Sequence, residues 1–235
     1  MAKPSKKLRV LVGEMHNHDF LWFSSFEISK TATTAPILHN YALTYAVNGF
    51  SHGTYRGCSP RYKEDLALMS SYATPALPLG QAKSTRFTQN AINSKTLRTD
   101  DAPGGKNSPA LGWRIALDPT WTGTDVETGF KFYLFAEDSF KPASVIRLGK
   151  KGCPIRIQWT EIAGAEAIFC ENPVVPSHAV NPLDVAGNIV SCSPLAIPPH
   201  LVFQRAEIEN DWFIFNNKHK IHVPSRWLDR VANAH

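Results

Sequence analysis

The sequence lacks a cysteine framework, a long apolar run and a high density of charge. Its four cysteines form no C-x-x-C pair, which argues against a zinc knuckle. The longest uncharged stretch, residues 185–203, contains three prolines, so it cannot supply the roughly 20 apolar helical residues that cross a bilayer. The basic start at residues 1–9 leads into an expected strand rather than a signal sequence. We therefore expect a cytoplasmic protein with reduced thiols.

Motifs of several enzyme classes are also missing. The sequence contains no G-x-S-x-G, H-E-x-x-H or G-x-x-x-x-G-K-[ST] motif and no Rossmann glycine pattern. Neither a catalytic site of those classes nor a cofactor is therefore expected. Hydrophobic residues make up 43% of the 235 residues, which is enough for a folded core. The 17 prolines disfavour long helices and favour strands joined by irregular loops.

The net charge of +5 is distributed unevenly along the chain. Residues 1–156 contain 20 of the 25 Lys and Arg and 12 of the 20 Asp and Glu, a net charge of +8. Residues 157–204 contain four acids and no Lys or Arg, and residues 205–235 carry a net charge of +1. Basic charge gathered in one part of a chain is typical of a polyanion-binding protein, although solubility alone also explains it.

Hydrophobic periodicity predicts many strands and few helices. A 3/4-spaced apolar stripe predicts a helix over residues 33–47, capped by Thr33 or Thr34 and ended by Asn48-Gly49. Residues 51–65 are expected to form a loop, and residues 224–234 a short helix. Strands are expected at 8–15, 111–117, 129–136, 154–162, 211–215 and 218–223, the last two joined by an Asn216-Asn217 turn. The pattern favours an α+β fold with a largely antiparallel sheet.

The most pointed basic element is the run RLGKKG at residues 147–152. Its two glycines allow backbone N–H groups to approach an anion closely, and Arg147, Lys150 and Lys151 supply positive charge. The run predicts a phosphate-binding site, but a solvated hairpin turn has the same spacing.

Aromatic residues are interleaved with bases at two further places. Arg56, Arg61 and Tyr62 lie in the first, and Arg86, Arg98 and Lys106 lie near Phe87 in the second. Such a composition suits stacking on single-stranded bases, which contributes about 1–3 kcal/mol per base. Ordinary surface residues are the alternative interpretation.

Two histidine-containing segments offer other chemistry. His16, His18 and Asp19 would hold a metal if a further ligand joined them, but a hydrogen-bonded turn at a strand end is favoured, so no metal site is predicted. His39, beside Tyr41, would serve as a general acid or base in metal-independent RNA cleavage. A packed residue at the start of a helix is the favoured interpretation of His39.

Three segments together resemble one CRISPR family. They are HDFLWF at residues 18–23, ILHNYALTYA at residues 37–46 and IRLGK at residues 146–150. The sequence resembles the Cas-five-like (Csc-one) RAMP subunit of type I-D effector complexes. The resemblance implies a single RAMP domain over residues 1–235, with an RRM-like (ferredoxin-like) core and a thumb hairpin in 1–156. It implies a β-rich, proline-rich elaboration in 157–235.

The resemblance also implies a function. It predicts a non-catalytic subunit that binds the 5′ handle of the crRNA, caps the complex and lies near the PAM duplex of the target DNA. Its expected protein partners are the large subunit and the backbone RAMP subunit, and no membrane is involved. RNA contacts are expected first from Arg147, Lys150 and Lys151, then from Arg56, Arg61 and Tyr62, and then from Arg86, Arg98, Lys106 and Trp113 near the thumb. The motif residues His39, Asn40 and Tyr41 are expected to be structural.

Two alternatives remain open from the sequence. The first is a repeat-RNA endoribonuclease that uses His39 or His18 without a metal. The second is a protein- or carbohydrate-binding β module that uses exposed aromatic residues. Residues 157–204 are expected to face a protein neighbour or solvent.

Overall fold

The computed structural model describes residues 6–28, 31–49, 60–80, 82–89, 110–117, 129–150 and 152–232. These residues form four β-sheets and three α-helices, and their strand pairs are antiparallel apart from β4 (Thr31–Thr33) with β8 (Ala110–Leu117). The expected α+β class with mostly antiparallel sheets is confirmed. None of the helices in these ranges is long and apolar enough to span a membrane. Four residues expected to bind RNA lie outside the described ranges: Arg56, Arg98, Lys106 and Lys151.

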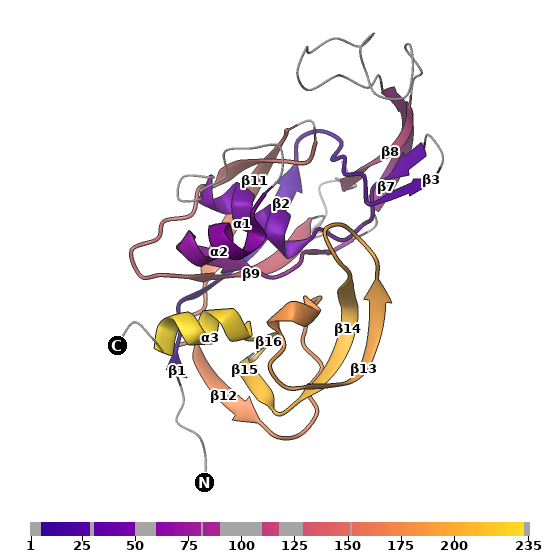
Figure 1. Ribbon diagram of the computed structural model, residues 1–235. Helices are drawn as coiled ribbons and strands as arrows, with labels where there is room; N and C mark the ends of the chain where they lie inside the picture. Colours follow the sequence, from indigo (N-terminus) through magenta and orange to yellow (C-terminus); the bar gives the residue numbers. More distant parts are fainter. Residues whose placement is uncertain are drawn as a thin grey trace.

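A six-stranded sheet occupies the centre of the molecule (Figure 1). Its order is β10-β11-β2-β9-β5, and β6 also pairs with β9. The strands are β2 (Val10–Asn17), β5 (Ser71–Ala73), β6 (Leu77–Pro78), β9 (Phe130–Ala136), β10 (Val145–Leu148) and β11 (Cys153–Glu161). The predicted alternation in β11 is confirmed, since Ile155 and Ile157 are buried whereas Arg156 and Gln158 are exposed.

Helix α1 (Asn40–Asn48) covers one face of this sheet. Leu43 and Val47 pack there in one hydrophobic cluster with Met15, Phe132 and Ile155. The predicted helix start was wrong, because residues 31–33 form strand β4 and pair with β8. His39 caps the helix instead of Thr33 or Thr34. The predicted end is confirmed, with Gly49 in the left-handed conformation at φ 61°.

Helix α2 (Tyr62–Leu68) replaces the end of the loop predicted over residues 51–65. Its first turn is fixed by Asp65, whose carboxylate accepts hydrogen bonds from Arg61 N at 3.1 Å and from the Tyr45 hydroxyl at 2.7 Å. The second of these bonds comes from α1, so α2 is stabilised by a tertiary contact. A helix this short gave no hydrophobic periodicity in the sequence.

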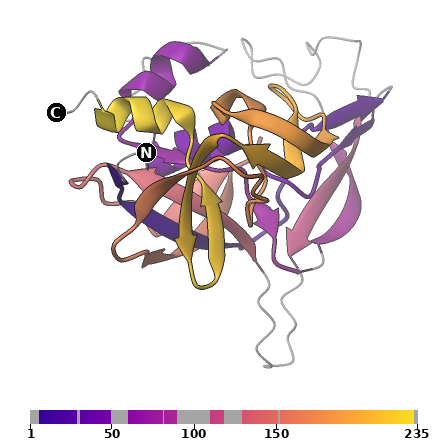
Figure 2. The same ribbon diagram turned by 90° about the horizontal axis from the view of Figure 1, so that it is seen from below.

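The opposite face of the six-stranded sheet meets the C-terminal part of the chain. A four-stranded sheet, ordered β1-β12-β15-β16, and helix α3 (Ser225–Ala232) pack Ile214, Ile221 and Trp227 against Val12 and Tyr133. Its strands are β1 (Lys6–Lys7), β12 (Glu166–Cys170), β15 (Asp211–Asn216) and β16 (His219–His222). Figure 2, seen from below, shows its orange and yellow strands in front of the six-stranded sheet.

The predicted C-terminal hairpin is confirmed, but its turn is shifted by one residue. Asn216 pairs with His219, so the turn residues are Asn217 and Lys218 rather than Asn216 and Asn217. The predicted C-terminal helix is confirmed as α3.

Two smaller sheets complete the fold. A two-stranded sheet of β13 (Asn188–Leu195) and β14 (Val202–Glu209) follows a short 3₁₀ helix, η1 (Pro182–Asp184). A second sheet stands away from the body in Figure 1. It has the order β3-β4-β8-β7 and contains β3 (Phe26–Ile28), β4 (Thr31–Thr33), β7 (Ala82–Gln89) and β8 (Ala110–Leu117). Strands β7 and β8 form a hairpin in the region expected to contain the thumb.

Candidate nucleic-acid interface

The described residues of the basic run, 147–150 and 152, lie at the end of strand β10 and in the turn into β11. Leu148 pairs with Cys153, and Gly149 and Gly152 adopt φ values of 78° and 63°, which a side chain would strain. A Cβ on Gly149 would lie 2.7 Å from the carbonyl oxygen of Trp22. Two amides of this turn are engaged within the protein, since Lys150 N donates to Trp22 O at 3.0 Å and Gly152 N to Gly149 O at 3.0 Å. These two amides are therefore not available to an anion, which would be bound by the side chains of Arg147 and Lys150.

The turn borders a groove of about 700 Å³. Helix α1 provides one wall through His39, Ala42 and Tyr45, and residues 197–199 contribute another part of the lining. The groove thus brings together residues from three distant segments that the sequence analysis singled out: Arg147 with Lys150, Tyr62, and His39. Most of its lining is apolar, with the two cations on the turn. We call it the cationic groove.

Arg147 and Lys150 are both exposed. In the described part of the chain neither lies within ion-pair distance of a carboxylate. The Arg147 guanidinium donates one bond, from Nη1 to Gly152 O at 3.1 Å, which leaves four N–H donors. The Lys150 ammonium lies 5.1 Å from the centre of the Trp22 ring, a cation–π distance. Both charges are held in place without being neutralised.

Tyr62 is half-buried at the start of α2 and lines the cationic groove. Its ring centre lies 5.0 Å from that of Tyr41 and 5.9 Å from that of Tyr45. Tyr41 and Tyr45 are buried, so they hold the ring of Tyr62 in place, and the half-buried Tyr62 is the ring of the three that a nucleobase would meet. Arg61 precedes the helix and is exposed.

His39 is a buried capping residue. Its Nδ1 accepts a hydrogen bond from Tyr41 N at 3.1 Å, and its ring centre lies 4.6 Å from that of His200. Burial, with a smaller contribution from the charge of the neighbouring His200, lowers the pKa of His39 to about 3. The ring is therefore neutral at physiological pH and adds no positive charge to the groove.

Comparison with known proteins identifies the family. The sequence model described as "Type I-D CRISPR-associated protein Cas5/Csc1" matches residues 8–228. The chain belongs to this family. No curated protein matches its sequence.

A chain of one solved structure is similar over most of its length. That structure is described as "Cryo-EM structure of the Type III-B Cmr-beta bound to cognate target RNA and AMPPnP, state 1". The alignment covers 95% of the present chain and 89% of the other, at 8% sequence identity and a TM-score of 0.39.

The projecting hairpin of this Cas5/Csc1 family member carries Arg86 and Trp113. The two residues pair directly across β7 and β8, and Arg86 is exposed. The hairpin is linked to the cationic groove by ring contacts that the sequence did not indicate. The Phe87 ring meets the Trp22 ring edge-on at 5.7 Å, and the Arg114 guanidinium lies 5.2 Å from the centre of Phe87. Trp22, which also contacts Lys150, therefore joins the two regions.

A buried polar network holds the start of α1 in this Cas5/Csc1 chain. The Asn40 side chain donates to the Tyr72 hydroxyl at 2.8 Å, and that hydroxyl donates to Asp184 at 2.8 Å. Arg226 Nε donates to the same carboxylate at 2.8 Å. Burial raises the pKa of Asp184, and the positive charge of Arg226 partly opposes this shift. The sequence showed no signal for the pairing of Asp184 with Arg226.

The segment containing His16, His18 and Asp19 forms a strand end and a turn. Both histidines are exposed, and Asp19 Oδ1 accepts a hydrogen bond from Phe20 N at 2.6 Å. Among the residues that the structure describes, no three His, Cys, Asp or Glu side chains are placed to hold a metal ion.

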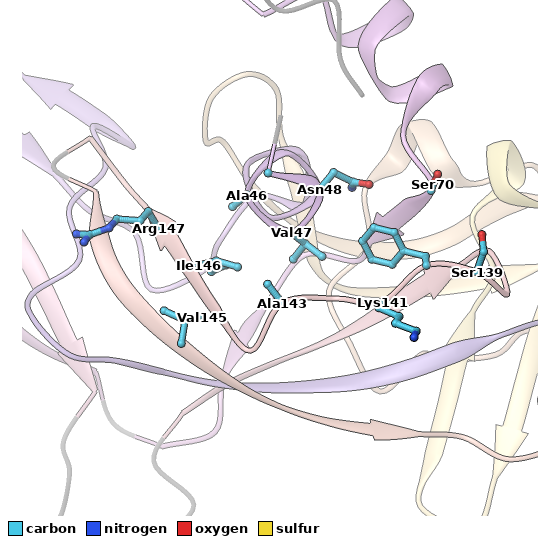
Figure 3. Close-up of a pocket in the computed structure, with 12 residues that line it drawn as sticks. Ala46, Val47, Asn48, Ser70, Ser139, Lys141, Ala143, Val145, Ile146 and Arg147 are labelled. Carbon is cyan, nitrogen blue, oxygen red and sulfur yellow. The ribbon is translucent and has the colours of Figure 1, made fainter. Parts of the chain in front are cut away.

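A second cavity, of about 890 Å³, lies between the end of α1 and β10 (Figure 3). Val47 and Ile146 contribute apolar surface to it, and Lys141 and Ser139 add polar groups. In Figure 3 the Arg147 side chain points away from the centre of this cavity. Arg147 therefore contributes its aliphatic part here and does not direct its charge into it.

Proposed function

We propose that this chain binds the 5′ handle of the crRNA in a type I-D effector complex, through the cationic groove. The observation that carries the proposal is the meeting of Arg147, Lys150 and Tyr62, from two distant segments, around one groove. Within the residues that the structure describes, the two cations have no carboxylate partner, so they can bind phosphates, and the tyrosine offers a stacking surface. Family membership supports this role, because the chain is a type I-D CRISPR-associated protein.

We further infer that the six-stranded sheet is an elaborated RRM-like core. Its four main strands follow each other as β2, β5, β9 and β11, and they lie in the order β11-β2-β9-β5. This is the order 4-1-3-2, which an antiparallel βαββαβ unit adopts. Helix α1 lies between the first and second strands. Between the third and fourth strands, an RRM has its second helix, whereas this chain has strand β10. The core therefore departs from the βαββαβ pattern at this point. The β7–β8 hairpin is the proposed thumb.

The protein acts without catalysis in this proposal. A general acid or base works best with a pKa near the operating pH, and His39, whose pKa is about 3, does not meet this condition. Its Nδ1 is also committed to the cap of α1. His18, the other candidate of the ribonuclease hypothesis, is exposed at a turn outside the cationic groove.

The remaining parts of the proposal concern partners. A subunit that holds the handle at one end of the guide lies beside the large subunit, the backbone RAMP subunit and the PAM duplex of the target DNA. Exposed strand β13, in the acidic segment 157–204, is a surface available to a protein neighbour. Guide pairing then reads the target sequence, and the protein reads shape and the PAM.

A salt series tests the handle-binding role. Labelled CRISPR repeat RNA is titrated with the wild-type protein and with Arg147→Gln combined with Lys150→Gln. Loss of two phosphate contacts should weaken binding about tenfold and flatten the slope of log K against log salt by about 1.4. Arg205→Gln is the matched control, since Arg205 is exposed on β14, away from the groove lining. An unchanged slope in the double variant would remove the turn from the RNA site.

The same reactions test for catalysis. The RNA should remain intact with and without EDTA. Discrete cleavage that His39→Asn abolishes would favour the ribonuclease hypothesis instead.

A further inference from the structure

A row of polar and basic side chains crosses the face of the six-stranded sheet opposite α1. In antiparallel strands, residues that pair directly lie on the same face. Arg156 of β11 pairs with His16 of β2, and Glu14 of β2 pairs with Lys131 of β9. The intervening residues, including Met15 and Ile157, are buried in the cluster with α1. The row therefore points away from α1 and away from the wall of the cationic groove.

The C-terminal sheet covers only part of this face. Val12 and Tyr133, further along the same strands, are buried against Ile214 and Ile221. His16 and Arg156, at the other end, are exposed, and Lys131 is half-buried. We call the uncovered part, defined by Arg147, Arg156, His16, Lys131 and Glu14, the open sheet face.

The open sheet face has an excess of positive charge. Arg147, Arg156 and Lys131 face it. Within the described ranges none of these three forms an ion pair. Glu14 is the acid in the row. The positive charge also affects His219. Burial lowers the pKa of this histidine, the charges of Lys131 and Lys218 lower it further, and the charge of Glu14 raises it.

We infer that the open sheet face binds the phosphate backbone of single-stranded RNA that continues from the cationic groove. Two observations favour this occupant: the charge complements phosphate, and Arg147 stands at the strand edge where groove and sheet face meet. From β10 to β9 the row spans three strand spacings, about 14 Å, so it has room for several nucleotides. Cationic and amide side chains contact phosphates without reading sequence. The inference rests on the proposed RNA-binding role of the groove.

Two RNA lengths separate the two surfaces. The full-length protein is titrated with single-stranded RNA of about 4 and about 12 nucleotides, lengths that bracket short and extended single-strand sites. Arg156→Gln combined with Lys131→Gln should weaken binding of the longer RNA about tenfold and flatten its salt slope by about 1.4, without changing binding of the shorter RNA. Glu14→Gln removes a negative charge and should strengthen binding of the longer RNA two- to threefold. Arg205→Gln should change neither.

The outcomes distinguish the inference from the function on which it rests. If the sheet variants bind the longer RNA like the wild type, the open sheet face is not an RNA surface, whatever the groove does. If Lys150→Gln, which removes the groove cation that lies outside the open sheet face, leaves binding of the shorter RNA as in the wild type, the groove fails and the sheet inference fails with it. Preference of the sheet face for a 12-base-pair DNA duplex over RNA of the same length would overturn the assignment to single-stranded RNA. Thermal unfolding of each variant, expected to match the wild type, excludes misfolding as the cause.

Discussion

Arg147 and Arg226 lie in different regions of the molecule and meet different surroundings. Arg147 is exposed on β10, and its guanidinium bonds to one carbonyl of its own turn. The side chain of Arg226 extends from α3 into the buried network, where it donates hydrogen bonds to Asp184 and, at 3.2 Å, to the Tyr41 hydroxyl. It also lies 5.1 Å from the centre of the Tyr72 ring. The guanidinium of Arg226 therefore bonds within the fold, whereas most N–H donors of Arg147 remain available to an external partner.

This difference separates stability from binding. Asp184 is fully buried and accepts bonds from three side chains, so its negative charge depends on Arg226 for compensation. Arg147 compensates no carboxylate in the described residues. Removal of Arg226 should therefore lower the stability of the fold. Removal of Arg147 should leave the stability unchanged but weaken RNA binding.

The largest expected effect is that of Arg226→Ala on stability. The substitution leaves the carboxylate of Asp184 buried and unpaired, which costs about 3 kcal/mol of the free energy of unfolding. Arg147→Ala removes an exposed side chain and should change this free energy by less than about 0.5 kcal/mol. Urea unfolding followed by circular dichroism measures both values. Equal effects of the two substitutions would contradict the comparison.

A double variant tests the same point. Arg226→Ala with Asp184→Asn removes both charges, and it should recover part of the lost stability because no uncompensated carboxylate remains. A double variant less stable than Arg226→Ala would show that the unpaired carboxylate of Asp184 is not the cause of the stability lost in Arg226→Ala.

A smaller effect on stability is expected from pH, and it should arise from the buried His39. Burial lowers the pKa of His39 to about 3, whereas an unfolded histidine titrates near 6.5. Between these values the unfolded state binds the proton more tightly, so stability is complete above pH 6.5 and falls as the pH decreases. At pH 5 the loss from this group is about 2 kcal/mol.

His39→Asn isolates this contribution. Asparagine retains an oxygen that caps α1 but does not titrate. Between pH 7 and pH 5, urea unfolding should show a loss about 2 kcal/mol smaller in the variant than in the wild type. His178, whose pKa burial also lowers to about 3, remains in both proteins and its contribution cancels. Parallel losses in both proteins would mean that His39 is already accessible to protons in the fold.

The sequence predicted those features that depend on local pattern. The alternation of apolar and polar residues was sufficient for β11 and for the β15–β16 hairpin. The contiguous run containing Arg147 and Lys150 showed its cationic character directly. The start of α1 was misplaced because Thr33 has a nonlocal partner, Trp113 on β8, that outweighs its local tendency to cap a helix.

The buried network could not be predicted in the same way. Tyr72 and Asp184 are 112 residues apart, and neither shows a motif or periodicity that marks it as a partner of the other. The groove was predicted only as separate segments for the same reason. Pairing these segments requires knowledge of which strands lie side by side.

The smallest expected effect concerns the turn that positions Lys150. Gly149→Ala places a Cβ 2.7 Å from Trp22 O at a φ of 78°, so the turn must shift away from Trp22. The expected cost is about 1–2 kcal/mol in the free energy of unfolding, together with a two- to threefold weaker affinity for RNA. Gly152→Ala is the matched control: its φ is 63°, but the nearest atom, Arg147 Cδ, lies 3.7 Å from the added Cβ. It should share the backbone cost and leave the Lys150–Trp22 contact intact, so RNA affinity should fall only for Gly149→Ala. An equal loss of affinity in both variants would mean that turn geometry in general, rather than the contact with Trp22, positions the lysine for RNA.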